Sequence, residues 1–252
     1  MNQPYGSDLA YIHDVGFSAH ALKSAPGILA ILQQAGLQGS LIVDLGCGTG
    51  LSAQAFTQAG YQVLGIDLSS AMVEIARRRV PTATFRVESL LQAALPSCGA
   101  VTAIGECFNY LFDPTHNRQT LRHLFGRIYH ALMPGGMLIF DSLTLGQIPP
   151  GTPTKTFMEG ADWVVLVEKS EDPIQQILTR RILSFRQVGD WFRRDQEIHR
   201  QQLYDPADLE QLLQQVGFEV EVMDGYGDYC LPQGRVAFRA QTLSGLDGRI
   251  PR

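Results

Sequence analysis

The chain of 252 residues is long enough to bury a sizeable core, and 45% hydrophobic with 18% charged residues is typical of a globular protein. A net charge of −5, with no basic run longer than Arg77–Arg79, argues against a nucleic-acid partner, because such proteins normally carry a basic patch. No stretch reaches the roughly 18 apolar residues of a membrane span, and the N-terminus lacks a secretory signal pattern. With four scattered cysteines that favour reduced thiols, we expect a soluble cytoplasmic protein without nucleic-acid or membrane partners.

Short apolar runs with strand character alternate with amphipathic segments between residues 40 and 141. The predicted strands are 41–43, 62–66, 84–87, 100–104 and 137–140, and the predicted helices are 50–59, 69–79 and 115–132. Alternation of this kind indicates βαβ units in a parallel sheet, and nearly continuous Val, Ile and Leu suits strands covered on both faces. The pattern predicts an α/β fold with a doubly wound, mostly parallel sheet and helices on both faces.

A different pattern begins after the proline-rich segment 149–153. Three antiparallel strands are predicted at 163–167, 177–185 and 191–203, an inserted β meander joined by turns at 171–173 and 188–190. Asp205 as N-cap with Pro206 in the first turn then begins a helix, and 218–223 and 235–242 predict two last strands.

These elements predict four parts of the chain. They are an N-terminal helical cap (1–39), a cofactor-binding domain (40–150 with 204–243), the inserted antiparallel strands (151–203) and a frayed tail (244–252). The insertion follows the fifth strand, so it begins at the sheet edge where a ligand is expected. It is either a substrate lid that supplies Arg200, Tyr204 or Trp191, or a dimer surface.

The most informative segment is the glycine-rich DLGCGTG at 44–50, a strand that leads directly into a helix. Its alternate glycines allow a tight turn and close approach of a ligand, and the helix directs free N–H groups toward it. Alone, this is a generic nucleotide-binding turn, with a turn without ligand as the alternative.

Two acids make the interpretation more specific. Asp44 ends the first strand, where a NAD-binding fold keeps an apolar residue, and Asp67 ends the second, where a carboxylate suits the two ribose hydroxyls.

At three ordered motifs the sequence resembles the class I S-adenosylmethionine-dependent methyltransferases, and the resemblance covers most of the chain. DLGCGTG is similar to the family's cofactor loop, GIDLS at 65–69 to its ribose-binding strand end, and LMPGGMLIFD at 132–141 to its turn into the fifth strand. The resemblance implies a seven-stranded sheet with an antiparallel last strand, and S-adenosylmethionine bound across the carboxyl ends of the strands.

The resemblance also implies which residues bind the cofactor. Asp44 and Gly46–Gly50 would hold the methionine half, Asp67 the ribose, and Leu68 with Met72 the adenine. The full implied set is Asp44, Leu45, Gly46, Cys47, Gly48, Gly50, Asp67, Leu68, Met72, Glu88, Ser89, Leu90, Gly105 and Glu106. The family's acid after the third strand is absent, so Glu88 or Ser89 must replace it.

Methyl transfer is an in-line displacement that mainly requires alignment, and it needs a base only when the nucleophile arrives protonated. We expect the reacting carbon near 104–111, a stretch similar to small-molecule N-methyltransferases with an "NYL" element. Gly105 permits close approach, and the candidate catalytic residues are Glu106, Asn109, Tyr110 and His13. Asn109 as a turn cap, Tyr110 as core and His13 as an ordinary helix residue are the alternatives.

Three histidines recur every seven residues at His116, His123 and His130, on one predicted helix. Successive members lie about 10 Å apart by the helix rise, too far for one metal ion, so we expect a solvent-facing stripe and no metal site. Arg77–Arg79 is interpreted as a charged helix end favoured by the dipole. Cys47 has no neighbours that indicate a nucleophile.

The sequence predicts S-adenosylmethionine-dependent methyl transfer to a small-molecule acceptor, at nitrogen in preference to oxygen. One alternative is a nicotinamide-dependent oxidoreductase with the same loop type, although Asp44 and the 134–136 turn argue against it. The other is a non-catalytic S-adenosylmethionine-binding protein, left open by Ser89 and Gly99, where acids are common in the family. The acceptor and the oligomeric state, including a homodimer, stay open.

Overall fold

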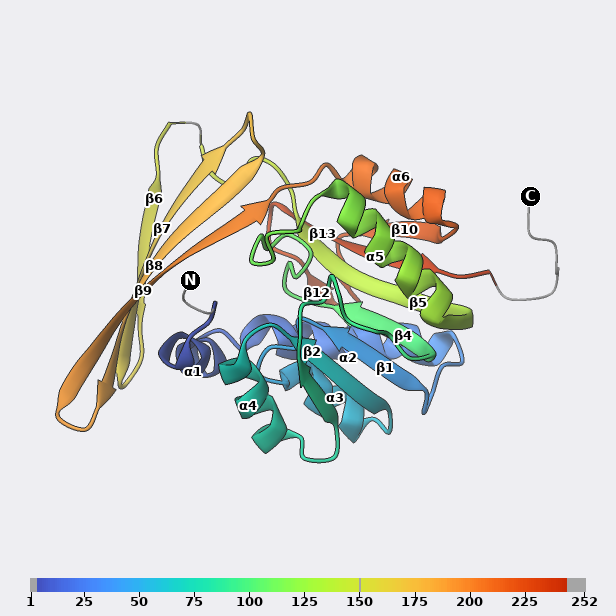
Figure 1. Cartoon of the computed structure of the whole chain (residues 1–252), viewed down its shortest axis with the longest axis horizontal. Helices are drawn as coiled ribbons and strands as arrows, with labels where there is room; N and C mark the ends of the chain where they lie inside the picture. Colours follow the sequence, from blue (N-terminus) through green and yellow to red (C-terminus); the bar gives the residue numbers. More distant parts are fainter. Residues whose placement is uncertain (1–3, 150, 244–252) are drawn as a thin grey trace.

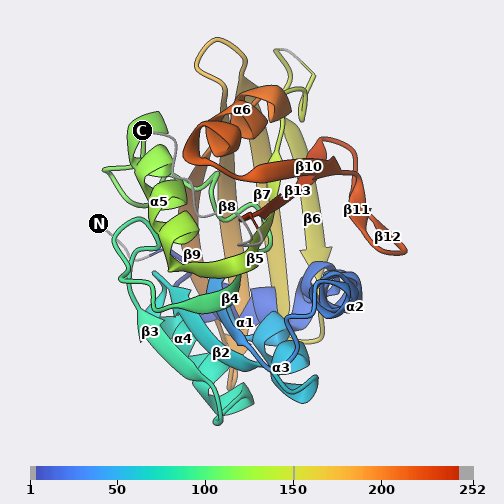
Figure 2. The same cartoon turned by 90° about the vertical axis from the view of Figure 1, so that its right-hand side faces the viewer.

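A computed structural model describes residues 4–149 and 151–243 of the chain, so the predicted tail at 244–252 lies outside the described residues. It consists of a large mixed sheet between helices and a second, smaller sheet beside it (Figures 1 and 2). Within the described ranges, no single helix is long and apolar enough to span a membrane. The bent pair formed by the first two helices reaches that length and composition only when the two are taken together.

The large sheet has seven strands in the order β10-β13-β5-β4-β1-β2-β3. Its members are β1 (Leu41–Leu45), β2 (Gln62–Asp67), β3 (Thr84–Val87), β4 (Cys98–Ala103), β5 (Leu132–Leu143), β10 (Glu219–Met223) and β13 (Arg235–Gln241). Strands β1 to β5 run parallel, and β13 is antiparallel to both of its neighbours. The predicted seven-stranded, mostly parallel sheet with an antiparallel last strand is confirmed.

Helices cover both faces of this sheet. They are α2 (Ala19–Gln34), α3 (Leu51–Gln58), α4 (Ser70–Arg79), α5 (Arg118–Ala131) and α6 (Pro206–Val216), whereas α1 (Ser7–Gly16) packs elsewhere. One apolar core joins α5 and α6 to the sheet, and another joins α2, α3 and α4 to its opposite face. All six residues of β4 are buried as a result, which explains the continuous apolar strands of the sequence. The predicted N-cap at Asp205 is confirmed, because its side chain accepts from Ala207 N–H and Pro206 is the first residue of α6. Ser69 caps α4 in the same way by accepting from Met72 N–H.

The insertion forms a separate antiparallel sheet of four strands, not the three predicted. The strands are β6 (Thr154–Glu159), β7 (Trp163–Asp172), β8 (Ile177–Val188) and β9 (Trp191–Gln202), paired in chain order. Strand β6 was missed because it has no buried residue, and so its sequence carries no apolar alternation. A two-stranded hairpin, β11 (Gly225–Tyr226) with β12 (Tyr229–Cys230), was also not predicted.

Helix α1 packs between the two sheets. Leu9 and Ile12 of this helix form a small apolar core with Trp163, Val165 and Ile182 of the inserted sheet. Figure 1 shows the inserted sheet standing beside the large one, with α1 at the junction. The N-terminal segment and the insertion therefore meet over the same edge of the large sheet.

Candidate functional site

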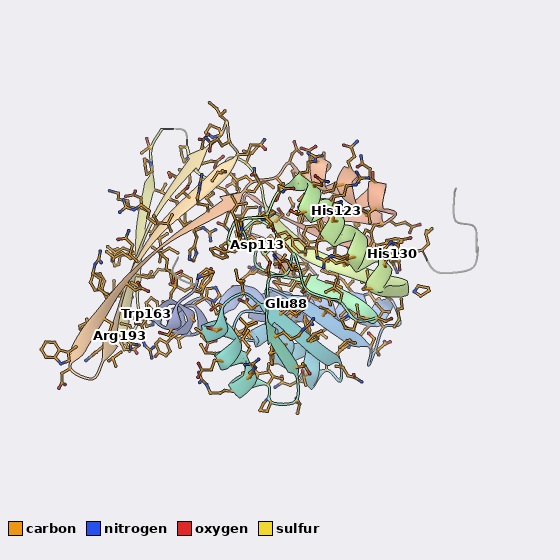
Figure 3. The ribbon with its side chains drawn as sticks, in the orientation of Figure 1. Glu88, Asp113, His123, His130, Trp163 and Arg193 are labelled. Atoms are coloured by element: carbon orange, nitrogen blue, oxygen red, sulfur yellow. The ribbon has the colours of Figure 1, made fainter. Side chains whose placement is uncertain are left out.

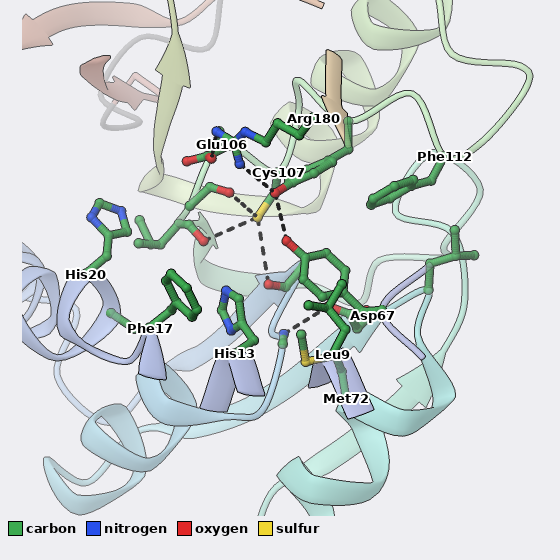
Figure 4. A pocket seen from close by; sticks show the side chains of 18 of the residues that line it. Leu9, His13, Phe17, His20, Asp67, Met72, Glu106, Cys107, Phe112 and Arg180 are labelled. Atoms are coloured by element: carbon green, nitrogen blue, oxygen red, sulfur yellow. Dashed lines mark hydrogen bonds and ion pairs between the residues drawn. The ribbon is translucent and has the colours of Figure 1, made fainter. Parts of the chain in front are cut away.

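A cavity of about 460 Å³ lies where β1, β2 and β4 end, beneath α1 and the inserted sheet (Figure 4). This volume falls within the roughly 300–1,000 Å³ usual for small-molecule sites. Most of its walls come from the segments after the three strands, the N-terminal segment 5–21, and one face of the inserted sheet. Residues 89–91 after β3 and Arg235 of β13 complete them. The predicted edge of the sheet is therefore the edge that carries the cavity.

The glycine loop after β1 forms one wall with a backbone that only glycine tolerates easily. Gly46 and Gly48 line the cavity, with φ values of 72° and 52°. A Cβ on Gly46 would lie 2.5 Å from Cys107 Sγ, so the two loops can approach only with glycine there. Asp67 is held beside this loop, because its carboxylate accepts from Gly48 N–H at 2.9 Å and Ser69 N–H at 2.8 Å.

The predicted cofactor residues divide into two groups. Those that line the cavity are Gly46, Gly48, Asp67, Leu68, Met72, Ser89, Leu90, Gly105 and Glu106. Those that the structure does not bring to its surface are Asp44, Leu45, Cys47, Gly50 and Glu88. Leu45 and Cys47 belong to the apolar cores instead, and Gly50 packs against Ala76 of α4. Leu45, Cys47 and Gly50 thus support the glycine loop from behind.

Glu106 is a buried carboxylate between two guanidinium groups (Figure 4). It is 4% exposed, and its oxygens lie 2.9 Å from Arg180 Nη2 and 2.6 Å from Arg235 Nη1. Burial by itself favours the neutral acid, but Arg235 and Arg180 outweigh it and hold the pKa of Glu106 at about 2. A carboxylate that stays ionised and fully paired is a poor general base, which corrects the sequence-based proposal for this residue.

Asn109 is not a cavity residue, contrary to its selection as a catalytic candidate. It is fully buried, and its Nδ2 donates to the carbonyls of Leu143 and Gln202. Its Oδ1 accepts from Leu143 N–H and the Ser142 hydroxyl. With its amide occupied in this way, Asn109 ties the loop after β4 to β5 and β9.

Tyr110 and His13, the other catalytic candidates, do line the cavity. The Tyr110 hydroxyl lies 2.9 Å from that of Tyr5, and burial raises the Tyr110 pKa to about 12, so the phenol stays protonated. The Tyr110 ring also stacks on Phe112 at 4.7 Å. His13 has a buried Nδ1 without a hydrogen-bond partner, and burial lowers its pKa below the ordinary 6.5. His13 is therefore neutral at pH 7.

The inserted sheet supplies cavity residues, but not those predicted. Trp191 is 79% exposed at a hairpin tip, and neither Arg200 nor Tyr204 lines the cavity. The residues that do line it alternate along three strands: Thr156, Met158, Val165, Val167, Lys169, Arg180 and Ile182. The alternation of apolar and polar residues along these strands is imperfect, because the opposite face also carries exposed apolar residues, among them Phe157 and Leu166.

Comparison with known proteins connects this geometry to a chemistry. Residues 42–136 match a family model described as a methyltransferase domain. A Geobacillus sp. (strain WCH70) protein named as a methyltransferase is 29% identical over 197 residues, which cover 75% of this chain and 78% of that protein. The solved S-adenosylmethionine-dependent methyltransferase from Clostridium acetobutylicum ATCC 824 has the same fold, with a TM-score of 0.79 and 19% identity, over 93% of this chain and 97% of that one. A solved sugar N-methyltransferase from Streptoalloteichus sp ATCC 53650 also has this fold, with a TM-score of 0.73 and 18% identity, over 94% of this chain and 92% of that one.

The chain carries a methyltransferase domain at 42–136, and its relatives and its fold support an S-adenosylmethionine-dependent methyltransferase of class I. The resemblance found in the sequence is thereby confirmed, together with the enzyme class and the cofactor. Neither the oxidoreductase alternative nor the non-catalytic one finds support among these relatives.

The methyltransferase's cavity residues fit this cofactor. Asp67 would accept from the ribose hydroxyls, and Leu68, Met72 and Leu90 would provide apolar contact for adenine. Below the glycine loop, Asp44 is 2% exposed and its Oδ2 has no partner, while Oδ1 accepts from Thr102. Burial raises the pKa of Asp44 to about 7 against the effect of that hydrogen bond, with Asp67 adding to the rise. An unpartnered carboxylate at this depth suits a cationic ligand, and the bound cofactor would supply an activated methyl group.

An acid lies beside Ser89 at the end of the third strand, although it is distant in the sequence. Ser89 lines the cavity, and its hydroxyl donates to Asp113 of the loop after β4, which lines the cavity too. Burial opposes the ionised form of Asp113, but hydrogen bonds from Ser89 and Thr115 lower its pKa below the ordinary value. Asp113 is 24 residues from Ser89 in the sequence, so no local pattern connects the two.

Two further histidines of the methyltransferase lie at the cavity. His20 was overlooked; its Nε2 is 3.0 Å from the fully buried Asp141, which also accepts from Glu106 N–H. His116 is not part of the predicted solvent-facing stripe, because α5 begins after it; its ring contacts the Tyr110 carbonyl and lines the cavity. His123 and His130 are exposed on α5, as predicted (Figure 3).

Proposed function

We propose that this methyltransferase acts on a small-molecule acceptor, and that it methylates nitrogen in preference to oxygen. The observation that carries the proposal is the form of the cavity, in which one space joins the glycine loop and Asp67 to a wall of aromatic and charged side chains. That wall comes from α1, the loop after β4 and the inserted sheet. A space enclosed on three sides suits a compact acceptor better than a polymer.

The insertion is proposed to be a substrate lid. In support of this role, Val165, Val167 and Ile182 of β7 and β8 line the cavity. A dimer surface, the alternative, would use only the opposite face of the inserted sheet. A wall built from an element outside the large sheet can change with the acceptor while the cofactor loop stays the same.

Nitrogen is favoured by the available proton acceptor. An amine of ordinary basicity arrives protonated at pH 7, and it must lose a proton before it can attack a methyl group. His13 is neutral at that pH and lies in the wall, whereas Glu106 is held ionised by two arginines and Tyr110 keeps its proton. We assign His13 as the base, and the hydroxyls of Tyr5 and Tyr110 as groups that orient the acceptor. The similar fold of a sugar N-methyltransferase supports this choice.

The test is product identification with a labelled methyl donor. The enzyme is incubated with methyl-deuterated S-adenosylmethionine and a panel of small amines, each matched to the corresponding alcohol and carboxylic acid. We expect transfer to amines, detected by mass spectrometry as a base-stable N-methyl product. Transfer only to alcohols or acids would refute nitrogen specificity.

A further inference from the structure

The inserted sheet places two cations directly opposite each other on its cavity face. Lys169 of β7 and Arg180 of β8 are cross-strand partners in the antiparallel register, and both side chains line the cavity. Like charges in this arrangement destabilise a pair of strands. A sheet that keeps two cations there, over an enclosed space, loses stability unless an anion offsets the repulsion.

The chain itself provides too little negative charge at this place. Arg235 of β13 adds a third cation, and the only carboxylate among the charged groups that act on Lys169 is Glu106. Glu106 is already paired with both arginines. Three cations therefore share one carboxylate.

Two donors at this place have no acceptor within the described part of the chain. Lys169 makes no ion pair or hydrogen bond there, and burial together with Arg180 lowers its pKa from the ordinary value. The Nε of Arg180 is buried and unpartnered, although Nη2 of the same side chain reaches Glu106 at 2.9 Å. The buried Nε of Arg180 would normally have a partner, so a missing acceptor is expected beside it.

We propose that the methyl acceptor carries an anionic group, a carboxylate or a phosphate, that binds Lys169 and Arg180. The inference rests on the proposed function and defines the acceptor class further. An anion at this place would relieve the repulsion between the two cations and accept from the unpartnered donors. The acceptor is then a small amine that also carries an acid group.

The methionine carboxylate of the cofactor is the other possible source of the same chemistry. The cofactor-holding groups Gly46, Gly48 and Asp67 belong to the large sheet, whereas Lys169 and Arg180 belong to the inserted one. We therefore assign the cations to the acceptor, and the experiment separates the two sources.

The experiment compares Lys169→Gln with wild type and with Lys155→Gln, a control on β6 whose side chain is 77% exposed and does not line the cavity. Thermal unfolding of each protein with S-adenosylhomocysteine is followed during titration with inorganic phosphate, succinate or uncharged succinamide at constant ionic strength. We expect phosphate or succinate, but not succinamide, to raise the Tm of wild type and Lys155→Gln. Lys169→Gln should need about 10- to 100-fold more anion, the usual loss for one hydrogen bond to a charged group.

Two further measurements keep the result unambiguous. Calorimetric affinity for S-adenosylhomocysteine should be the same in wild type and Lys169→Gln, and Lys169→Arg should restore the anion effect. Without anion, Lys169→Gln should unfold no earlier than wild type, because it removes a repulsion. No anion effect on wild type, or a loss of S-adenosylhomocysteine affinity in Lys169→Gln, would overturn the assignment. Failure of wild type to bind S-adenosylhomocysteine would instead refute the proposed function, and the titration of the cofactor-free chain would still decide whether the cations bind an anion.

Discussion

Glu106 illustrates how neighbours change the chemistry of a residue that the sequence presents as a base. Its backbone is left-handed, with φ of 51°, a conformation that costs a non-glycine residue roughly 1–2 kcal/mol. Its N–H donates to Asp141, and its carboxylate joins Arg180 and Arg235. The surroundings thus fix both the position and the charge of Glu106. It organises the arginines of the site and does not take protons.

His13 leads to a prediction about pH dependence. Because burial lowers its pKa below 6.5, His13 is a neutral proton acceptor at pH 7 and becomes protonated only as the pH falls further. The kcat/KM of the wild-type enzyme should therefore be constant near pH 7 and decrease on the acid side, below 6.5. His13→Asn should lower kcat by about 10²- to 10⁴-fold at pH 7 and remove that acid limb.

The control for this variant is cofactor affinity, which should be unchanged in His13→Asn when measured with S-adenosylhomocysteine. A pH profile that keeps its acid limb in the variant would show that another group is the base. An unchanged kcat at pH 7 would exclude His13 from proton transfer altogether.

At the scale of elements, the site depends on the close approach of loops and helices. Arg79, interpreted from the sequence as a charged helix end, joins α4 to α1 through Asp14 and to the glycine loop through the Thr49 carbonyl at 2.7 Å. The Asp14 contact is 2.8 Å long, and both partners are at most 20% exposed on the side chain. The ion pair therefore holds the N-terminal helix against the cofactor loop.

The contact of the glycine loop with the loop after β4 can be tested with Gly46→Ala. The new Cβ would lie 2.5 Å from Cys107 Sγ, in addition to the cost of the left-handed φ. We expect a loss of about 2–5 kcal/mol in the free energy of unfolding, from roughly 1–2 for backbone and 1–3 for overpacking. Denaturant titration measures this difference.

Gly60→Ala is the matched control, because its φ of 90° is also left-handed and its Cβ would meet nothing within 4 Å. It should lose only the backbone contribution and keep its affinity for S-adenosylhomocysteine. Equal losses in the two variants would show that the loops are not in tight contact at Gly46.

At the scale of the whole molecule, one cavity connects the large sheet, α1 and the inserted sheet, so a ligand should stabilise all three. S-adenosylhomocysteine at 100 times its Kd should raise the free energy of unfolding by about 2.7 kcal/mol. Asp67→Ala should lose most of this gain, because the carboxylate that accepts from the ribose is removed. Thermal unfolding with and without the ligand provides the measurement.

The control is the free energy of unfolding of Asp67→Ala without ligand. This free energy should decrease by less than the stabilisation by S-adenosylhomocysteine does, although Asp67 also accepts from Gly48 N–H and Ser69 N–H. If stability and affinity decline equally, the role of Asp67 is structural.

The sequence by itself determined the fold class, and it located the glycine loop and Asp67 at the ends of the first two strands, because these features depend on local patterns. Apolar runs, N-caps and glycines act within a few residues, and strands β1 to β5 with their helices were predicted from them. Glycine spacing and an acid at a strand end are also read along the chain, without knowledge of what packs beside them.

Only the tertiary structure decided how the charged side chains are arranged around the cavity. Lys169, Arg180 and Arg235 converge on Glu106 from three strands, and Asp113 meets Ser89 across 24 residues. Asn109, a catalytic candidate in the sequence, instead donates hydrogen bonds to carbonyls of β5 and β9. Charge, burial and pKa arise from contacts between segments distant in sequence, so no pattern along the chain could reveal them.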